Sequence, residues 1–263
     1  MAQNLMVGVH LGRPLPQSPD HSLINHVINH AETPQVRDHA TSASMGFHSD
    51  AQADILQLGC KQQAVDGGTS SIVDAGSVLL KMKDRGYIAE VAILQQLNFY
   101  RDVTRYQFVD QTGCEPYMAM PPFSVYNGRL WSTFNGNHYE LCNRKYPTAC
   151  SLSDLQRQAI RVFQQTAQEL ELQLTLQPGD ILLLNNHTML HARSTFKDGP
   201  EPHQRRHLIR LWLGCEEMAA LAPPHLGFER CYGPSFDPAA YHGLLKPQPA
   251  LFHVPSSSED SGL

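Results

Sequence analysis

Short stretches in which hydrophobic and polar residues alternate recur through the middle of the chain, and this pattern is typical of half-buried β-strands. The continuous apolar run at 181–184 indicates a strand that is covered on both faces. An Asn-Gly pair at 127–128, inside a β-branched and aromatic stretch, predicts a hairpin over 123–136. The remaining predicted strands are 54–63, 70–75, 105–110, 171–176 and 206–214.

Two stretches follow the helical period instead. The clearer one covers 153–170, where Ser153 and Gln156 form a capping box and apolar residues fall on one stripe. The second covers 74–86 and ends at Gly86. The polar start of the chain, which several prolines interrupt, gives only a short helix near 21–30.

These elements predict one mainly β domain of the α+β class, with helices outside the sheets. The domain is expected to cover 46–250. An irregular leader is expected over 1–45, and a disordered tail over 251–263, where serine and acidic residues dominate.

Composition narrows the function classes. The 263 residues carry a formal net charge of -5 and no long basic run, so neither nucleic acid nor an anionic membrane is an expected partner. No stretch approaches eighteen apolar residues. The six cysteines form no CxxC pair, which favours free thiols in a reducing, cytoplasmic compartment. A small molecule is the expected partner, and assembly into a homo-oligomer is left open.

The stretch HTMLH places His187 and His191 four residues apart, as in helical zinc proteases. No glutamate follows His187, and the apolar run before it predicts a strand rather than a helix. On an extended backbone two side chains four apart are too distant to chelate one ion readily. At most one of the two histidines is therefore expected to bind a metal, and a purely structural role for both is the alternative.

A partner for one of these histidines stands in GFHSD, where His48 and Asp50 are two residues apart on a predicted extended segment and so share a face. Two imidazoles and one carboxylate are the ligand set of non-haem Fe(II) oxygenases. His30 and Glu32 offer the same spacing, but they lie in a stretch predicted to be helical, where side chains two apart diverge.

The predicted strand RRHLIRLWL places Arg206 and Arg210 on the same face as Leu208 and Trp212. Two buried guanidinium groups need anionic partners, which structural ion pairs or a bound carboxylate would provide. From these residues alone, structural ion pairs and a bound carboxylate both remain open interpretations.

The stretch PGDILLLNNHTMLHARSTF, the strand RRHLIRLWL, and the upstream GFHSD and DGGTSSIVDA together resemble the TauD/TfdA family of Fe(II)/2-oxoglutarate-dependent dioxygenases. The resemblance runs from about Gly46 to Gly214. It implies a double-stranded β-helix (jelly roll) with flanking helices, whose N-terminal part is shortened here. It also implies Fe(II), 2-oxoglutarate as co-substrate, and O2.

The resemblance carries over to single residues. His48, Asp50 and His191 match the iron ligands, Arg206 the arginine that holds the distal carboxylate of 2-oxoglutarate, and Arg210 a position that meets substrate in some members. Either Ser70 or Thr69 matches the hydroxyl residue that assists the 2-oxoglutarate carboxylate. Arg193 and His187 are implied to be structural rather than catalytic.

The implied reaction is hydroxylation or desaturation of an unactivated C–H bond of a small molecule, in secondary metabolism or in amine or amino-acid catabolism, with release of succinate and CO2. A shortened, non-catalytic relative that acts as a binding subunit is one alternative. A cupin-like metalloenzyme that does not use 2-oxoglutarate is another, but it gives no reason for two arginines on one inward face.

Overall fold

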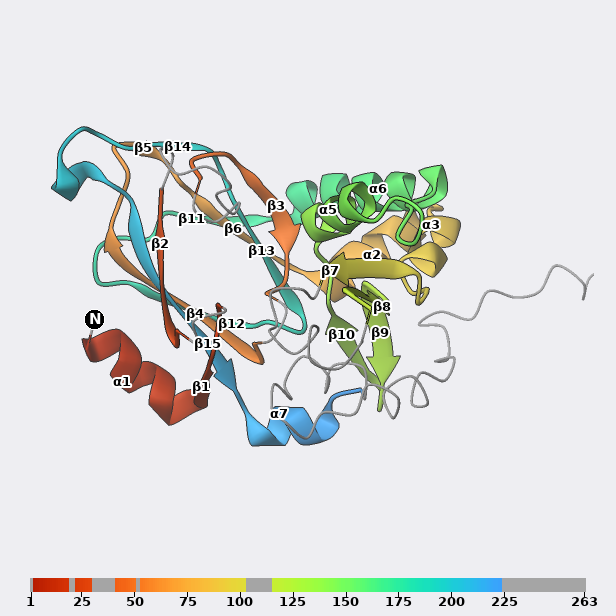
Figure 1. Cartoon of the computed structure of the whole chain (residues 1–263), viewed down its shortest axis with the longest axis horizontal. Coiled ribbons are helices and arrows are strands. Elements are labelled where there is room, and N and C mark those ends of the chain that lie inside the picture. The colour runs from red at the N-terminus through yellow and green to blue at the C-terminus, as the bar shows by residue number, and fades with distance from the viewer. Residues whose placement is uncertain (1, 19–21, 30–40, 51–52, 103–114, 224–263) are drawn as a thin grey trace, which may run out of the picture.

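A computed structural model of the chain describes residues 2–18, 22–29, 41–50, 53–102 and 115–223. Its strands form two main antiparallel sheets, and most of the helices gather at one end of the molecule, with the N-terminal helix at the opposite end (Figure 1). Within the described ranges, no helix combines the length and hydrophobicity that a bilayer crossing requires.

The larger sheet has five strands. β15 (His207–Gly214) pairs with β4 (Ile55–Gln62), which pairs with β12 (Ile181–Asn185). The other edge of β15 is covered at one end by β1 (Arg13–Leu15) and at the other by β2 (Ile24–Ile28). Helix α1 (Ala2–Leu11) packs on this sheet. β15 is therefore paired along most of its length, and residues 208–213 are buried. β12 instead lies at the edge of the sheet, and Leu183 is 41% exposed, so the prediction that the run 181–184 is covered on both faces is wrong.

The second sheet has four strands in the order β11 (Leu172–Leu174), β6 (Ser70–Asp74), β13 (Met189–Arg193) and β3 (Met45–His48). Shorter pairs join β5 (Asp66–Gly67) to β14 (Phe196–Lys197), and β7 (Phe99–Asp102) to β8 (Tyr117–Met120). Among the described strands the two main sheets share no hydrogen-bonded pair, so they do not close into a barrel.

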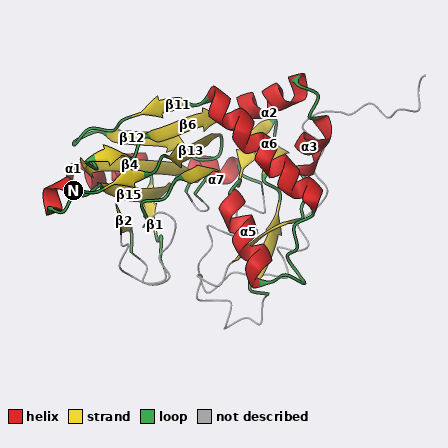
Figure 2. Cartoon of the chain, turned by 90° about the horizontal axis from the view of Figure 1, so that it is seen from above, coloured by secondary structure: helices red, strands yellow, loops and turns green. Residues whose placement is uncertain are grey.

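Most of the helices form a separate layer beside the four-stranded sheet, as Figure 2 shows from above. These are α2 (Ala75–Asp84), α3 (Ile88–Ile93), α5 (Gly136–Lys145) and α6 (Asp154–Leu170). A 3-10 turn (Pro202–Gln204) precedes β15 and α7 (Glu216–Leu221) follows it. The whole is a mixed fold with many antiparallel strands, which agrees with the predicted mainly β, α+β class at this level of detail.

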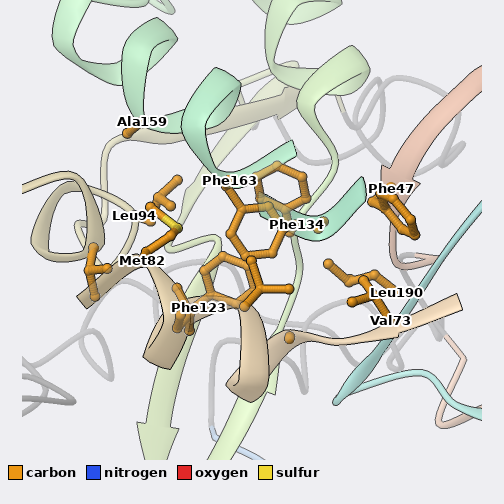
Figure 3. Packing of buried hydrophobic residues seen from close by; sticks show 14 of the residues in the cluster. Phe47, Val73, Met82, Leu94, Phe123, Phe134, Ala159, Phe163 and Leu190 are labelled. Atoms are coloured by element: carbon orange, nitrogen blue, oxygen red, sulfur yellow. The ribbon is translucent and has the colours of Figure 1, made fainter. Parts of the chain in front are cut away.

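Two hydrophobic cores hold these layers together. One lies between the sheets and includes Leu58, Leu184 and Trp212. The other joins the four-stranded sheet to the helices, where Phe123 and Phe134 stack with their ring centroids 5.5 Å apart and Phe163 packs against both (Figure 3). Such aromatic pairs add about 0.5–1.5 kcal/mol each beyond the area that they bury.

Several local predictions are confirmed. The capping box at Ser153 and Gln156 begins α6, which ends at Leu170. The Asn-Gly pair turns between β9 (Phe123–Tyr126) and β10 (Arg129–Ser132), and both of its residues have positive φ as a two-residue hairpin requires. The hairpin is shorter than predicted, because Asn135 instead caps α5.

The segment before residue 46 differs from its prediction. An irregular leader was expected, but α1, β1 and β2 lie there, and the expected helix near 21–30 is the strand β2. Short strands of this kind carry little local pattern, and pairing with β15 determines their structure. The predicted strand 105–110 and the tail 251–263 lie outside the described residues.

Candidate metal centre

Three side chains from two neighbouring strands converge at the inner side of the four-stranded sheet. β3 and β13 pair so that His48 stands directly opposite His191, and their ring centroids are 4.1 Å apart. Asp50 follows β3 immediately. One potential ligand atom from each of the three residues lies within 4.8 Å of the others, and all three side chains are buried. The structure therefore brings together the three residues that the sequence predicted as a metal-ligand set.

A hydrogen bond to the backbone of its own strand fixes the tautomer of His48. Nδ1 lies 2.9 Å from the carbonyl oxygen of Gly46, and because a carbonyl only accepts, Nδ1 carries the proton. Nε2 is consequently the atom through which His48 would bind a metal, and the Nδ1 hydrogen bond orients the ring, as is typical of ligating imidazoles.

His191 is held neutral. Burial, and after it the neighbouring His48 ring, lowers the pKa of His191 to about 3. A neutral imidazole has a lone pair to offer at any pH well above that value. Its Nδ1 is buried and has no hydrogen-bond partner among the described residues, which marks a polar atom that the protein alone does not satisfy.

Asp50 is held as an anion, and its two oxygens have different surroundings. Burial on its own raises the pKa of the Asp50 carboxyl, but the Arg210 guanidinium and then the neighbouring imidazoles hold it well below its usual range. Oδ2 accepts hydrogen bonds from Arg210 NH1 at 3.1 Å and from Trp212 Nε1 at 2.7 Å. Oδ1 lies 3.9 Å from Nε2 of His48. The oxygen turned toward the imidazoles is therefore Oδ1.

A pocket opens beside these three residues, between the two sheets, and encloses about 490 Å³ of space that is partly open to solvent. Basic and apolar side chains from both sheets line it: Val27, Met45, His48, Leu58, Ser70, Leu182, His191, Ala192, Arg193, Arg206, Leu208 and Arg210.

Arg206 supplies the pocket with a cation. The residue is 2% exposed, and its Nε is buried without a hydrogen-bond partner in the part of the chain that the structure describes. A Cβ on Gly68 would lie 2.9 Å from that Nε, so the glycine leaves space beside the guanidinium. Burial lowers the pKa of Arg206, yet an arginine stays charged at neutral pH. A buried cation with an unsatisfied donor fits a carboxylate.

The two candidates for the hydroxyl residue differ in their surroundings. Ser70 is buried and lines the pocket. Thr69 is absent from the lining, and its backbone N–H donates to Ser194 Oγ at 3.0 Å. Arg193 also borders the pocket but donates from NH2 to the carbonyl oxygen of Thr41 at 2.8 Å, which ties β13 to the segment before β3.

No role was predicted from the sequence for three residues around Asp50. Asn186 accepts a hydrogen bond from the Asp50 backbone N–H at 2.9 Å, and Gln17 accepts one from Arg210 Nε at 2.8 Å. Trp212 was placed on the inward face, but its bond to Asp50 was not anticipated. Asn186 directly follows β12, and its place just after the apolar run 181–184 is the sequence signal that could have drawn attention to it. Gln17 had none, because it lies in the expected irregular leader.

His187 belongs to a different part of the structure from His191. It is buried, its Nε2 lies 2.6 Å from Asp54 Oδ1, and its ring packs on Trp131 with centroids 4.6 Å apart. It is not one of the three clustered ligand residues. The i, i+4 pair of histidines is thus one candidate ligand and one structural residue. The competing His30 and Glu32 lie outside the described residues.

We expect His187→Ala to affect stability rather than activity. The change leaves the buried carboxylate of Asp54 without its imidazole partner, which costs about 1–3 kcal/mol. Urea unfolding should show that loss, while metal binding per folded molecule stays within a few-fold of the parent. Loss of metal binding from a protein of parental stability would contradict the assignment.

Two imidazoles and one carboxylate that meet on adjacent strands, beside a pocket with a buried cation, form a side-chain set typical of non-haem iron oxygenases. A family model described as "Taurine catabolism dioxygenase TauD, TfdA family" matches residues 4–212. The chain belongs to the TauD/TfdA family.

Two relatives illustrate the range of this family. The chain is 26% identical over 226 residues to FR-33289 synthase of Streptomyces rubellomurinus, an alignment that covers 80% of this chain and 62% of the relative. It is 23% identical over 222 residues to taurine hydroxylase-like protein SAT17 of Stachybotrys chartarum, which covers 80% of this chain and 55% of the relative. The chain thus spans less than two thirds of the length of either relative.

Solved structures of similar fold include asparagine oxygenase, AsnO, at 17% identity and a TM-score of 0.63 over 81% of this chain and 62% of the other. Another is the non-haem iron oxygenase OrfP with Fe, succinate and (3S)-hydroxy-L-Arg, at 14% identity and a TM-score of 0.56 over 80% of this chain and 65% of the other. At these identities the likeness concerns the fold.

Proposed function

We propose that this chain is an Fe(II)- and 2-oxoglutarate-dependent oxygenase that oxidises an unactivated C–H bond of a small molecule. His48, Asp50 and His191 would hold the iron, and Arg206 the distal carboxylate of 2-oxoglutarate. The observation that carries the proposal is the pairing of a buried His/Asp/His set with a buried, unsatisfied guanidinium in one pocket.

Two of the three proposed ligands are ready to bind without losing a proton, because His191 is neutral and Asp50 is ionised. His48 turns Nδ1 to the Gly46 carbonyl, so Nε2 is the atom that it would offer to a metal. The carboxylate of Asp50 supplies one negative charge, which favours a cation over a neutral ligand. One face of such a set is covered by protein, and the other is left for exchangeable ligands.

Iron, when bound, supplies oxygen activation coupled to decarboxylation of 2-oxoglutarate, so that one oxygen atom of O2 enters succinate and the other the substrate, with release of CO2. The protein contributes orientation and charge. Arg206, just before β15, places a cation in the lining of the pocket, and Ser70 on β6 of the facing sheet offers a hydroxyl for the same co-substrate. Leu58, Leu182 and Leu208 line the same pocket, and apolar walls of this kind strengthen an ion pair.

The substrate class that we propose is a small amino acid or a related amine of catabolism or secondary metabolism. Support comes from the neighbours, since AsnO has been crystallised with hydroxyasparagine and OrfP with hydroxyarginine. We propose hydroxylation as the reaction, because both of those crystallised ligands are hydroxylated amino acids, and desaturation is the alternative reaction. Contact between Arg210 and substrate stays a prediction.

The finer fold and domain assignments are also proposals. We infer that the two antiparallel sheets, with the pocket between them, are the two halves of a double-stranded β-helix, and that the oxygenase domain runs to about residue 250 with 251–263 after it. The domain takes in the segment before residue 46 as well, because β1 and β2 pair with β15. The antiparallel pairing throughout supports the first, and an experimental structure of the full chain would test both.

Succinate formation tests the proposed activity. Protein purified without oxygen should, with Fe(II), ascorbate, 2-oxoglutarate and air, produce succinate slowly alone and faster with one member of a panel of amino acids and amines. Heat-treated protein and omission of iron are the controls. Absence of iron-dependent succinate under every condition would favour a binding subunit, and metal-dependent oxidation without 2-oxoglutarate would favour a cupin-like enzyme.

A further inference from the structure

The buried side chain of Gln17 joins the N-terminal segment to Arg210 through both ends of its amide. Oε1 accepts a hydrogen bond from Arg210 Nε at 2.8 Å. Nε2 donates to the carbonyl oxygens of Arg210 at 3.0 Å and Leu23 at 2.9 Å. Gln17 is only 3% exposed, so these bonds are shielded from water. The amide therefore fixes the side chain and the backbone of the same arginine.

Arg210 in turn acts on Asp50. Its NH1 donates to Oδ2, the oxygen that Trp212 Nε1 also holds, and its guanidinium lies over the Trp212 ring at 4.9 Å. With Oδ2 engaged by two donors, the carboxylate plane is set and Oδ1 is turned to the ring of His48. The chain of contacts runs from Gln17 through Arg210 to one oxygen of Asp50.

We propose that Gln17 is a positioning residue for the metal centre. It fixes Arg210 so that Arg210 and Trp212 occupy Oδ2, and Asp50 presents Oδ1 alone to the metal. This proposal rests on the proposed function, because it assumes that His48, Asp50 and His191 bind a metal. The segment before β3 thereby contributes to the site. Arg210 has a hydrogen-bond partner within the protein, so its burial does not require a contact with substrate.

The physical reason lies in what the arginine would do without its anchor. Without the amide, Arg210 Nε loses its acceptor in a buried place, and the guanidinium has to rotate toward another acceptor or draw in water. Asp50 then keeps only the Trp212 bond and gains freedom to turn. Loss of an outer partner of this kind weakens metal binding by about 10- to 100-fold in proteins.

The test compares Gln17→Met with a matched control, Gln57→Met. Methionine preserves the length of the side chain and removes both hydrogen-bonding ends. Gln57 is likewise fully buried and ties the N-terminal helix to the sheet, donating from Nε2 to the Asn4 carbonyl at 2.6 Å, but it has no part in the contacts of Asp50. A third variant, Gln17→Glu, keeps the acceptor for Arg210 Nε.

The measurements are the Kd for Co(II) by calorimetry and the visible spectrum of the Co(II) protein, which reports ligand geometry independently of turnover. We expect Gln17→Met to raise the Kd about 10- to 100-fold and to change the spectrum. Gln57→Met should leave both unchanged, and Gln17→Glu should lie much nearer the parent than Gln17→Met. Thermal unfolding checks that each variant is folded.

An unchanged Kd and spectrum in folded Gln17→Met would overturn the proposal. So would an equal weakening in Gln57→Met, which would show that loosening the N-terminal segment in general is enough. If Gln17→Met does not fold, Gln17→Asn decides, because its shorter side chain keeps an amide but withdraws the acceptor from Arg210 Nε. A raised Kd for Co(II) with a changed spectrum supports the proposal, and a Kd and spectrum equal to those of the parent contradict it. A parent protein that binds no Co(II) would instead refute the proposed function itself.

Discussion

We expect Asp50→Asn to abolish tight metal binding and, with it, succinate formation. Arg210 and Trp212 both donate to Oδ2, so the amide of this variant has to turn its oxygen toward them. Its NH2 group, which has no lone pair to offer, then faces His48 in place of Oδ1. We expect the Kd for Fe(II) or Co(II) to rise at least about 100-fold, as removal of a direct ligand should exceed the effect of an outer partner.

A matched control is available four residues further along. Asp54 is buried as deeply as Asp50, and its carboxylate accepts hydrogen bonds from His187 and from the backbone N–H of Cys215 at 2.8 Å. Asp54→Asn should lower the free energy of unfolding and leave the metal content of the folded protein unchanged. Iron retained by Asp50→Asn but lost by Asp54→Asn would reverse the assignment of the two carboxylates.

Arg206→Met has the second large effect, on the co-substrate rather than on the metal. A charge-assisted hydrogen bond from a buried guanidinium is worth about 1.5–3 kcal/mol, which is roughly a 10- to 150-fold change in affinity. The KM for 2-oxoglutarate should rise by that factor, whereas the Kd for Co(II) should stay unchanged, because Arg206 is not part of the ligand set. Added guanidinium should restore part of the activity.

Arg205→Met is the control for this experiment. Arg205 is exposed and donates to the carbonyl oxygen of Pro200, so removing its charge should leave the KM nearly unaltered. A normal KM in Arg206→Met together with a raised KM in Arg205→Met would show that Arg205, and not Arg206, contacts the carboxylate. A normal KM in both would contradict the proposed contact between Arg206 and the carboxylate of 2-oxoglutarate.

The parts of this fold that local physics determines were predictable from the sequence. The capping box of α6 and the Asn-Gly turn each involve residues that are neighbours along the chain. The pairing of His48 with His191 is a long-range contact, and it was predicted because the residue types and the strands around them match a known family. Their roles as ligands stay a prediction.

The elements that the sequence did not reveal depend on distant partners. β1 and β2 are short strands whose pairing with β15 supplies the order that their own residues do not specify. Gln17 is one of many glutamines in the chain, and only the approach of Arg210 makes it distinctive. A polar residue in a proline-rich segment carries no signal of such a contact.

An anaerobic titration tests the central claim most directly, namely that one site binds Fe(II) and 2-oxoglutarate together. Protein with Fe(II) is titrated with 2-oxoglutarate in the absence of oxygen, and the visible absorption is recorded. We expect a weak charge-transfer band that saturates at one 2-oxoglutarate per chain and is lost in Asp50→Asn. A parent protein that binds Fe(II) tightly but develops no band at saturating 2-oxoglutarate would contradict it.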